Sequence, residues 1–119
     1  MIPGGLGEKE GSETIEKQVK LIINSPTDLT KRVIFNGGNC LGIFSIPGGY
    51  NTLFIPPYKL PIEKKFSKKL GFVSQSGAFL ITRISNQEQI IPSFGISFGN
   101  QIDLRVSDYI KYLKDDSNV

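Results

Sequence analysis

The pattern that most restricts the fold of this 119-residue chain is an alternation of two kinds of apolar run over residues 70–114. Short β-rich runs, "LGFVS" (70–74) and "SFGIS" (93–97), alternate with stretches of helical periodicity at residues 77–88 and 104–114. Strands that alternate with helices favour a parallel sheet with right-handed crossovers. The sequence therefore predicts an α/β fold, in which helices flank a parallel sheet.

The N-terminal part of the chain carries a further helical pattern. Ser12 precedes two first-turn glutamates and an apolar stripe, which predicts a helix over residues 13–24 with Ser12 as its N-cap. The β-rich run "RVIF" (32–35) then predicts a buried strand that enters a turn. In the last helix, Asp103 is expected to be the cap. The apolar stripe of that helix is expected to contain Val106, Tyr109, Ile110 and Leu113.

The segment between these two parts is rich in proline, glycine and lysine. We interpret residues 46–69 as an ordered connecting segment, since loops of this length are uncommon inside one compact unit. This interpretation separates residues 1–45 from residues 70–119. The basic run "EKKFSKK" (63–69) is explained most simply as a solvated loop, and a nucleic-acid binder would show a broader basic face. We therefore expect no nucleic-acid partner.

Composition excludes several classes of chemistry. The chain has no histidine, which excludes Ser-His-Asp and Cys-His catalysis and histidine-ligated metal sites within it. The single cysteine, Cys40, can form no internal disulfide and fits a reducing compartment, so we expect a cytoplasmic location. A membrane span needs about 18 apolar residues in a run, which the sequence lacks. We expect neither a membrane association nor a metal site.

The first polar junction, "SQSG" (74–77), lies between a predicted strand and a predicted helix. A helix start offers unpaired amides and about half a positive charge, and it binds phosphate readily. Ser74, Gln75, Ser76 and Gly77 are therefore candidate phosphate ligands. The alternative explanation is that Ser76 only caps its own helix, and the sequence leaves both possibilities open.

Two further junctions follow the same design, "NGGNCLG" (36–42) and "SFGNQID" (97–103). Glycine there allows positive φ angles, and Asn39 can bridge backbone groups across a turn. Each segment can also be a purely structural turn, with Cys40 as a small buried residue that no histidine activates. Because the carboxyl ends of parallel strands meet at one edge of a sheet, we expect these polar loops to converge on one crevice, which Gly99 and Asn100 would line.

In their order along the chain, these motifs resemble those of the nucleoside-diphosphate-forming acyl-CoA synthetases (acetate–CoA ligases of the ADP-forming type), relatives of the succinyl-CoA ligase α subunit. That family typically has a Gly-Gly-aromatic-x-Glu loop, then Gly-Pro-Asn-Cys-x-Gly, then Ser-Gln-Ser-Gly-Ala, then a Gly-Asn segment ahead of a helix. The resemblance covers nearly the whole chain. The corresponding segments are "GGLGE" (4–8), "GGNCLG" (37–42), "SQSGAF" (74–79) and "GNQIDLRVSDYIKYLKDD" (99–116).

The resemblance implies an internal piece of a longer enzyme. Residues 1–45 would be the C-terminal end of a Rossmann-like CoA-binding domain, and residues 70–119 the N-terminal half of a flavodoxin-like ligase domain. The implied reaction interconverts acyl-CoA, a nucleoside diphosphate and phosphate with a carboxylic acid, CoA and a nucleoside triphosphate, through an acyl phosphate and a phosphohistidine. That histidine would lie outside these residues. No catalytic residue is therefore expected among them, and the isolated piece should be inactive.

The resemblance also implies partners and site residues. ADP/ATP or GDP/GTP and Mg²⁺ would bind on an ATP-grasp partner, either a fused domain or a β subunit, and this segment would hold no cofactor tightly. Ile81 replaces a tyrosine that contacts substrate in succinyl-CoA ligases, which argues against succinate as the acid. Ser76 and Gly77, with Ser74 and Gln75, would hold phosphate; Gly4, Gly5, Asn39 and Cys40 would lie near CoA; Gly99 and Asn100 would line the crevice.

Two other functions remain open. The same domains could form a non-catalytic CoA-binding or acyl-CoA-binding regulatory module, and a histidine further along the protein would distinguish an enzyme from it. A flavodoxin-like nucleotide-binding domain would instead need aromatic residues beside the strand-end loops. Phe79 and Tyr50 are the nearby candidates for that role.

Overall fold

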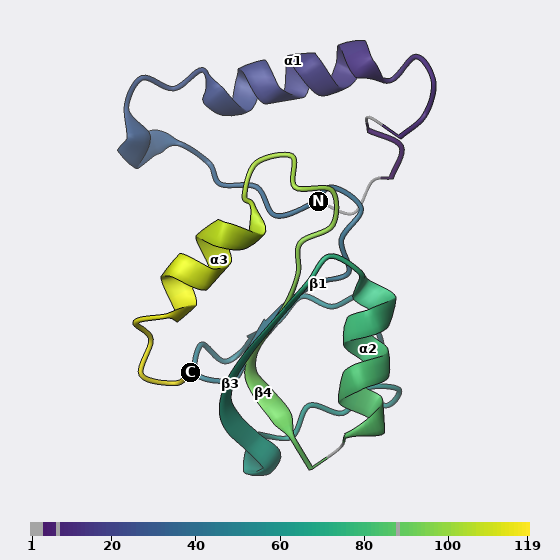
Figure 1. Ribbon diagram of the computed structural model, residues 1–119, viewed down its shortest axis with the longest axis vertical. Helices are drawn as coiled ribbons and strands as arrows, with labels where there is room; N and C mark the ends of the chain where they lie inside the picture. The colour runs from purple at the N-terminus through teal and green to yellow at the C-terminus, as the bar shows by residue number, and fades with distance from the viewer. Residues whose placement is uncertain (1–3, 7, 88) are drawn as a thin grey trace.

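The computed structural model describes residues 4–6, 8–87 and 89–119. Three α-helices, four strands and two short 3₁₀ turns are assigned within these residues (Figure 1). In chain order they are α1 (Glu13–Asn24), η1 (Leu29–Lys31), β1 (Gly42–Ser45), β2 (Tyr50–Asn51), η2 (Lys64–Phe66), β3 (Ser67–Ser74), α2 (Gly77–Asn86), β4 (Ile91–Ser97) and α3 (Val106–Leu113).

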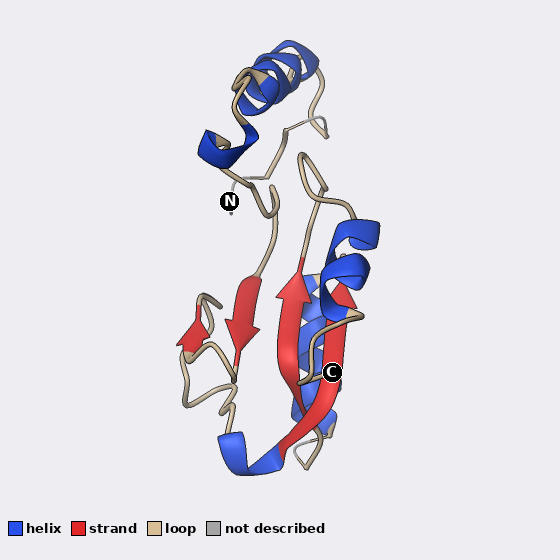
Figure 2. Ribbon diagram, turned by 90° about the vertical axis from the view of Figure 1, so that its left-hand side faces the viewer, coloured by secondary structure: helices blue, strands red, loops and turns tan. Residues whose placement is uncertain are grey.

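The four strands form one mixed sheet in the order β2-β1-β4-β3. Strands β3 and β4 pair in parallel and are connected through α2, as the strand–helix alternation predicts. Strand β1 is antiparallel to both β4 and β2, which corrects the expectation of an all-parallel sheet (Figure 2). The β1–β2 pairing is antiparallel because a tight turn joins the two strands, in which the Gly49 amide donates to the Ile46 carbonyl at 3.2 Å.

Helices α2 and α3 cover opposite faces of the sheet (Figure 1). All seven residues of β4 are buried, because helices cover this strand on both faces and neighbouring strands flank it. The core beneath α2 contains Leu41, Phe44, Leu60, Leu80, Ile84 and Ile91, whereas the core beneath α3 contains Phe94, Ile96, Phe98, Tyr109 and Leu113.

The proline-rich segment contributes to the first of these cores. Leu60 is only 3% exposed, and Leu53, Ile55 and Ile62 pack against the same cluster. Strand β2 also lies within this segment and pairs with β1. The division of the chain into residues 1–45, 46–69 and 70–119 stays a prediction.

Helix α1 begins and ends where the sequence predicts, but it lies apart from the sheet (Figures 1 and 2). Its apolar side chains Leu21 and Ile22 are each 71% exposed, and Ile23 is the buried residue of the helix. Ser12 is the N-cap residue, as predicted, but its hydroxyl donates to the Lys9 carbonyl at 2.6 Å and makes no side-chain capping bond to the helix.

The predicted strand at residues 32–35 is also wrong. This segment has no strand pairing, and Val33 and Ile34 are 65% and 62% exposed. Instead, the Phe35 amide donates to the Asp103 carboxylate at 2.9 Å, and Arg32 forms an ion pair with the same carboxylate. Asp103 is therefore not the cap of α3. The N-cap is Arg105, whose amide donates to Asp108 at 2.8 Å.

Helix α3 is shorter than predicted, and half of its expected stripe is buried. Tyr109 and Leu113 are buried against the sheet, whereas Val106 and Ile110 are 39% and 57% exposed. No helix in the described residues is long and apolar enough to cross a membrane.

Candidate functional site

The three polar junctions meet at one end of the sheet. The amides of Asn100 and Ile102 donate to the carbonyls of Gly38 and Gly37, each at 2.8 Å. On the other side of the same loop, the Phe98 amide donates to the Ser74 carbonyl at 3.0 Å. Loops 36–42, 74–77 and 97–103 are thus joined by backbone hydrogen bonds, as predicted, whereas a crevice lined by Gly99 and Asn100 stays a prediction.

Close packing explains two of the glycines at this junction. Gly99 has φ +57°, and a Cβ atom there would lie 2.1 Å from the Gly38 carbonyl oxygen. A Cβ atom on Gly77 would lie 2.5 Å from the Cβ of Leu41, which is itself buried. These two positions therefore need glycine for contacts within the protein itself.

At the start of α2, Ser76 caps its own helix. Its hydroxyl oxygen accepts from the Phe79 amide at 3.2 Å, which is an N-cap bond. The Ser74 hydroxyl is also engaged, because it donates to the Ser76 carbonyl at 2.9 Å. Capping by Ser76 leaves the first amides of α2 without an intrahelical acceptor, so they can still face an anion. A phosphate-binding role for residues 74–77 stays a prediction.

The N-terminal loop 4–8 joins the same junction. The Gly5 amide donates to the Glu8 carboxylate at 3.0 Å. This bond, together with the side-chain amides of Asn100 and Asn39, lowers the pKa of Glu8 below its ordinary value, although some burial opposes the shift. Glu8 was not identified from the sequence as a site residue; the only signal for it is its place at the end of the "GGLGE" motif.

A buried polar network supports these loops from below. The Tyr109 hydroxyl donates to the Asn36 side-chain oxygen at 2.5 Å, and Asn36 Nδ2 donates to the Ser97 carbonyl at 2.9 Å and to Cys40 Sγ at 3.3 Å. Cys40 is only 5% exposed. Its thiol is therefore part of the support for the loop, and only the neighbouring Asn39 is exposed to solvent.

The Tyr109 phenol makes stability depend on alkaline pH. Burial, with smaller effects of Cys40, Asp103 and Asp108, raises its pKa from 10 to about 12. Because the folded pKa lies above the unfolded one, this contribution to stability is complete below pH 10 and is lost as the pH rises towards 12. We expect the free energy of unfolding, measured in urea, to fall less steeply over this range in Tyr109→Phe. The exposed control Tyr58→Phe should keep the wild-type slope; equal slopes in both variants would contradict the assignment.

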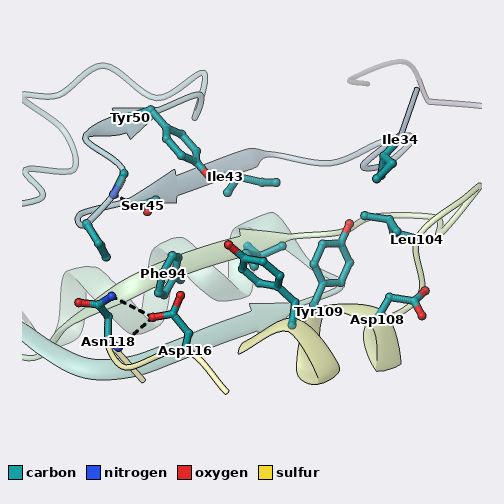
Figure 3. Close-up of a pocket in the computed structure, with 14 residues that line it drawn as sticks. Ile34, Ile43, Ser45, Tyr50, Phe94, Leu104, Asp108, Tyr109, Asp116 and Asn118 are labelled. Atoms are coloured by element: carbon teal, nitrogen blue, oxygen red, sulfur yellow. Dashed lines mark hydrogen bonds between the residues drawn. The ribbon is translucent and has the colours of Figure 1, made fainter. Parts of the chain in front are cut away.

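A hollow lies on the α3 face of the sheet, where the sequence predicts no site (Figure 3). It is a cavity of about 570 Å³, and mainly apolar side chains such as Ile43, Phe94 and Tyr109 line it. Its two acidic groups already have partners, since Asp108 accepts from the Arg105 amide and Asp116 accepts from Asn118. The hydrogen bonds from Asn118 lower the pKa of Asp116. No group of three or more potential metal ligands occurs in the described residues.

Comparison with known proteins gives matches over the whole chain. The family model described as "Succinyl-CoA ligase like flavodoxin domain" matches residues 67–119. A crystal structure of a protein from Pyrococcus horikoshii OT3 is 28% identical, with a TM-score of 0.79 over 99% of this chain and 25% of that chain. A search of curated proteins finds no match.

The dinucleotide forming acetyl-coenzyme A synthetase 1 of Candidatus Korarchaeum cryptofilum is also similar, both in its apo form and in complex with phosphate and ADP. It is 27% identical, with a TM-score of 0.79 over 100% of this chain and 24% of that protein. The present chain thus spans about a quarter of the length of these relatives. Residues 67–119 thus match the succinyl-CoA ligase-like flavodoxin domain, and the chain as a whole is similar in sequence and fold to a dinucleotide forming acetyl-coenzyme A synthetase.

Proposed function

We propose that this chain is part of an acid–CoA ligase that forms acyl-CoA at the expense of a nucleoside triphosphate, through an acyl phosphate and a phosphohistidine. The observation that carries the proposal is the meeting of four loops that follow the family's order, namely 4–8, 36–42, 74–77 and 97–103. Since the chain has no histidine, the phosphorylated residue would come from another part of the protein. The chain alone would then be inactive.

The start of α2 would hold the phosphoryl group. Its first amides and the positive end of its dipole would stabilise the negative charge that passes between acyl phosphate and histidine. This site would use the backbone amides around Gly77 and the hydroxyl proton of Ser76, whose oxygen alone is used in the bond from Phe79. The Ser74 hydroxyl is less suited, because it already donates to the Ser76 carbonyl. A helix dipole placed in advance needs no rearrangement during the transfer.

The remaining parts of the reaction would be divided among neighbouring elements. CoA, which supplies the thiol that takes up the acyl group, would approach from the side of Gly4, Gly5 and Asn39, where Asn39 is exposed. Cys40 would support this side only from beneath, because its thiol is buried. The nucleotide and Mg²⁺ would bind on an ATP-grasp domain or β subunit. Such an enzyme would work in the cytoplasm.

The proposal can be tested at Ser76 in the longer protein that carries this chain. Ser76→Asp keeps an efficient N-cap but adds a negative charge beside the bound phosphate. Like charges about 4 Å apart repel by roughly 4 kcal/mol near a protein surface, so phosphoenzyme formation should fall by at least about tenfold. The matched control Ser76→Asn caps the helix without the charge and should retain the wild-type level.

Two outcomes would contradict the proposal: equal phosphoenzyme levels in Ser76→Asp and Ser76→Asn, or no phosphoenzyme in the wild type. The second outcome, with acyl-CoA binding retained, would favour the non-catalytic regulatory module. Gly77→Val is a poor test, because its side chain would displace Leu41 and disturb the core. A flavin-type site is disfavoured by geometry, since Tyr50 lines the cavity on the α3 face, whereas Phe79 belongs to α2 on the opposite face.

A further inference from the structure

A carboxylate of the chain itself is held at the loop junction by neutral donors. Glu8 accepts from the Gly5 amide at 3.0 Å, and the amides of Asn100 and Asn39 favour its charged form. Within the described part of the chain, none of the four ion pairs involves Glu8. The site that holds this carboxylate therefore consists of N–H groups without a formal positive charge, which suits a single negative charge better than a multiply charged phosphate.

Glu8 does not accept hydrogen bonds from all of the N–H groups around it. Asn100 Nδ2 is buried and has no hydrogen-bond partner among the described residues. The Asn100 amide nevertheless lowers the pKa of Glu8, so it lies beside the carboxylate but outside good hydrogen-bonding geometry. A buried N–H without an acceptor destabilises the protein, and a better-placed oxyanion would remove this cost.

The backbones of the two asparagines are held in place by contacts that do not involve Glu8. The backbone amide of Asn100 donates to the Gly38 carbonyl at 2.8 Å, and Gly99 packs directly on the backbone of Gly38 and Asn39. Glu8, by contrast, belongs to an exposed loop. The exposed Glu8 side chain can therefore turn into solvent while the amides of Gly5, Asn39 and Asn100 stay in place.

From this geometry we propose that the amides of Asn39 and Asn100, together with the Gly5 amide, form a carboxylate-binding subsite for which Glu8 is an internal, displaceable occupant. The external ligand is a small monocarboxylic acid. That choice of ligand rests on the proposed function, in which such an acid is a substrate. Glu8 keeps the subsite closed until an acid replaces it.

Nuclear magnetic resonance of this chain tests the proposal, with sodium acetate as the probe and the side-chain amide signals of Asn39 and Asn100 as the readout. A tethered group competes at an effective concentration in the millimolar range, so removing it should strengthen acetate binding by about tenfold or more. We expect this gain in Glu8→Ala and also in Glu8→Gln, which preserves the size of the side chain. The matched control Glu10→Ala removes a nearby exposed glutamate and should bind acetate as the wild type does.

Sodium chloride and sodium phosphate are the comparison arms of the titration. The proposal is overturned if acetate produces no saturable shift in either Glu8 variant, if the wild type binds it equally well, or if chloride or phosphate produces the same response. Asn100→Ala combined with Glu8→Ala should abolish the acetate response. Because none of these measurements needs phosphoenzyme, a failure here with a normal result at Ser76 would remove the subsite alone. A failure at Ser76 with acetate binding intact would remove the proposed reaction alone.

Discussion

Gly95→Ala is expected to lower the free energy of unfolding by about 3 kcal/mol, which is the upper end of the range for an overfilled core. Gly95 pairs with Phe44 in the sheet, and an added Cβ atom would lie 2.0 Å from Cε1 of that ring. The ring cannot move aside easily, because Phe44 is 1% exposed and is enclosed by the core beneath α2. Urea unfolding followed by circular dichroism measures the loss.

A second substitution tests whether the clash with the Phe44 ring, rather than any added side chain in β4, causes the loss of stability. Phe44→Leu removes the ring, so Gly95→Ala should cost less in that background than in the wild type, which a double-mutant cycle will measure. Gly11→Ala is the control, since nothing lies within 4 Å of the added atom and only the φ of +82° opposes it. If Gly95→Ala unfolds at the wild-type urea concentration, this account of the core is wrong.

The elements that the sequence predicts correctly are those whose signals are local. Helix α1, strand β3 and helix α2 follow from local patterns, because apolar periodicity predicts the two helices and a short β-rich run predicts the strand. The meeting of the polar loops was predictable for a related reason. Parallel strands end at the same edge of a sheet, so the loops after β3 and β4 had to be neighbours.

The errors occur where a distant partner decides the structure. Residues 32–35 have the composition of a strand, but a carboxylate about 70 residues further along the chain holds them at the junction. Strands β1 and β2 were not predicted, because they are short and lie next to prolines and glycines. Glu8 was missed because its significance depends on two asparagines in other loops. Apolar periodicity and residue propensities do not predict contacts between segments that are distant in the sequence.

The ion pair of Asp103 with Arg32 joins these two distant segments, and Asp103→Ala is expected to destabilise the fold by about 3–5 kcal/mol, as for a buried pair that loses one partner. The Asp103 side chain is 6% exposed and that of Arg32 is 22% exposed, so water cannot fully replace the lost contact. The Phe35 amide would lose its acceptor as well. The surface pair of Glu16 and Lys20 in α1 is the matched control, and Glu16→Gln should cost less than about 1 kcal/mol.

Hydrogen exchange will show where the Asp103→Ala effect acts. The Asn100 and Ile102 amides donate to the loop that follows residues 32–35, so they should exchange faster in Asp103→Ala than in the wild type. Amides of α2 should exchange faster only to the extent that the whole fold is weakened. Asp103→Asn keeps an acceptor for the Phe35 amide and should fall between the wild type and alanine. Unchanged exchange at Asn100 and Ile102 in the alanine variant would mean that Asp103 does not hold the loops of the candidate site together.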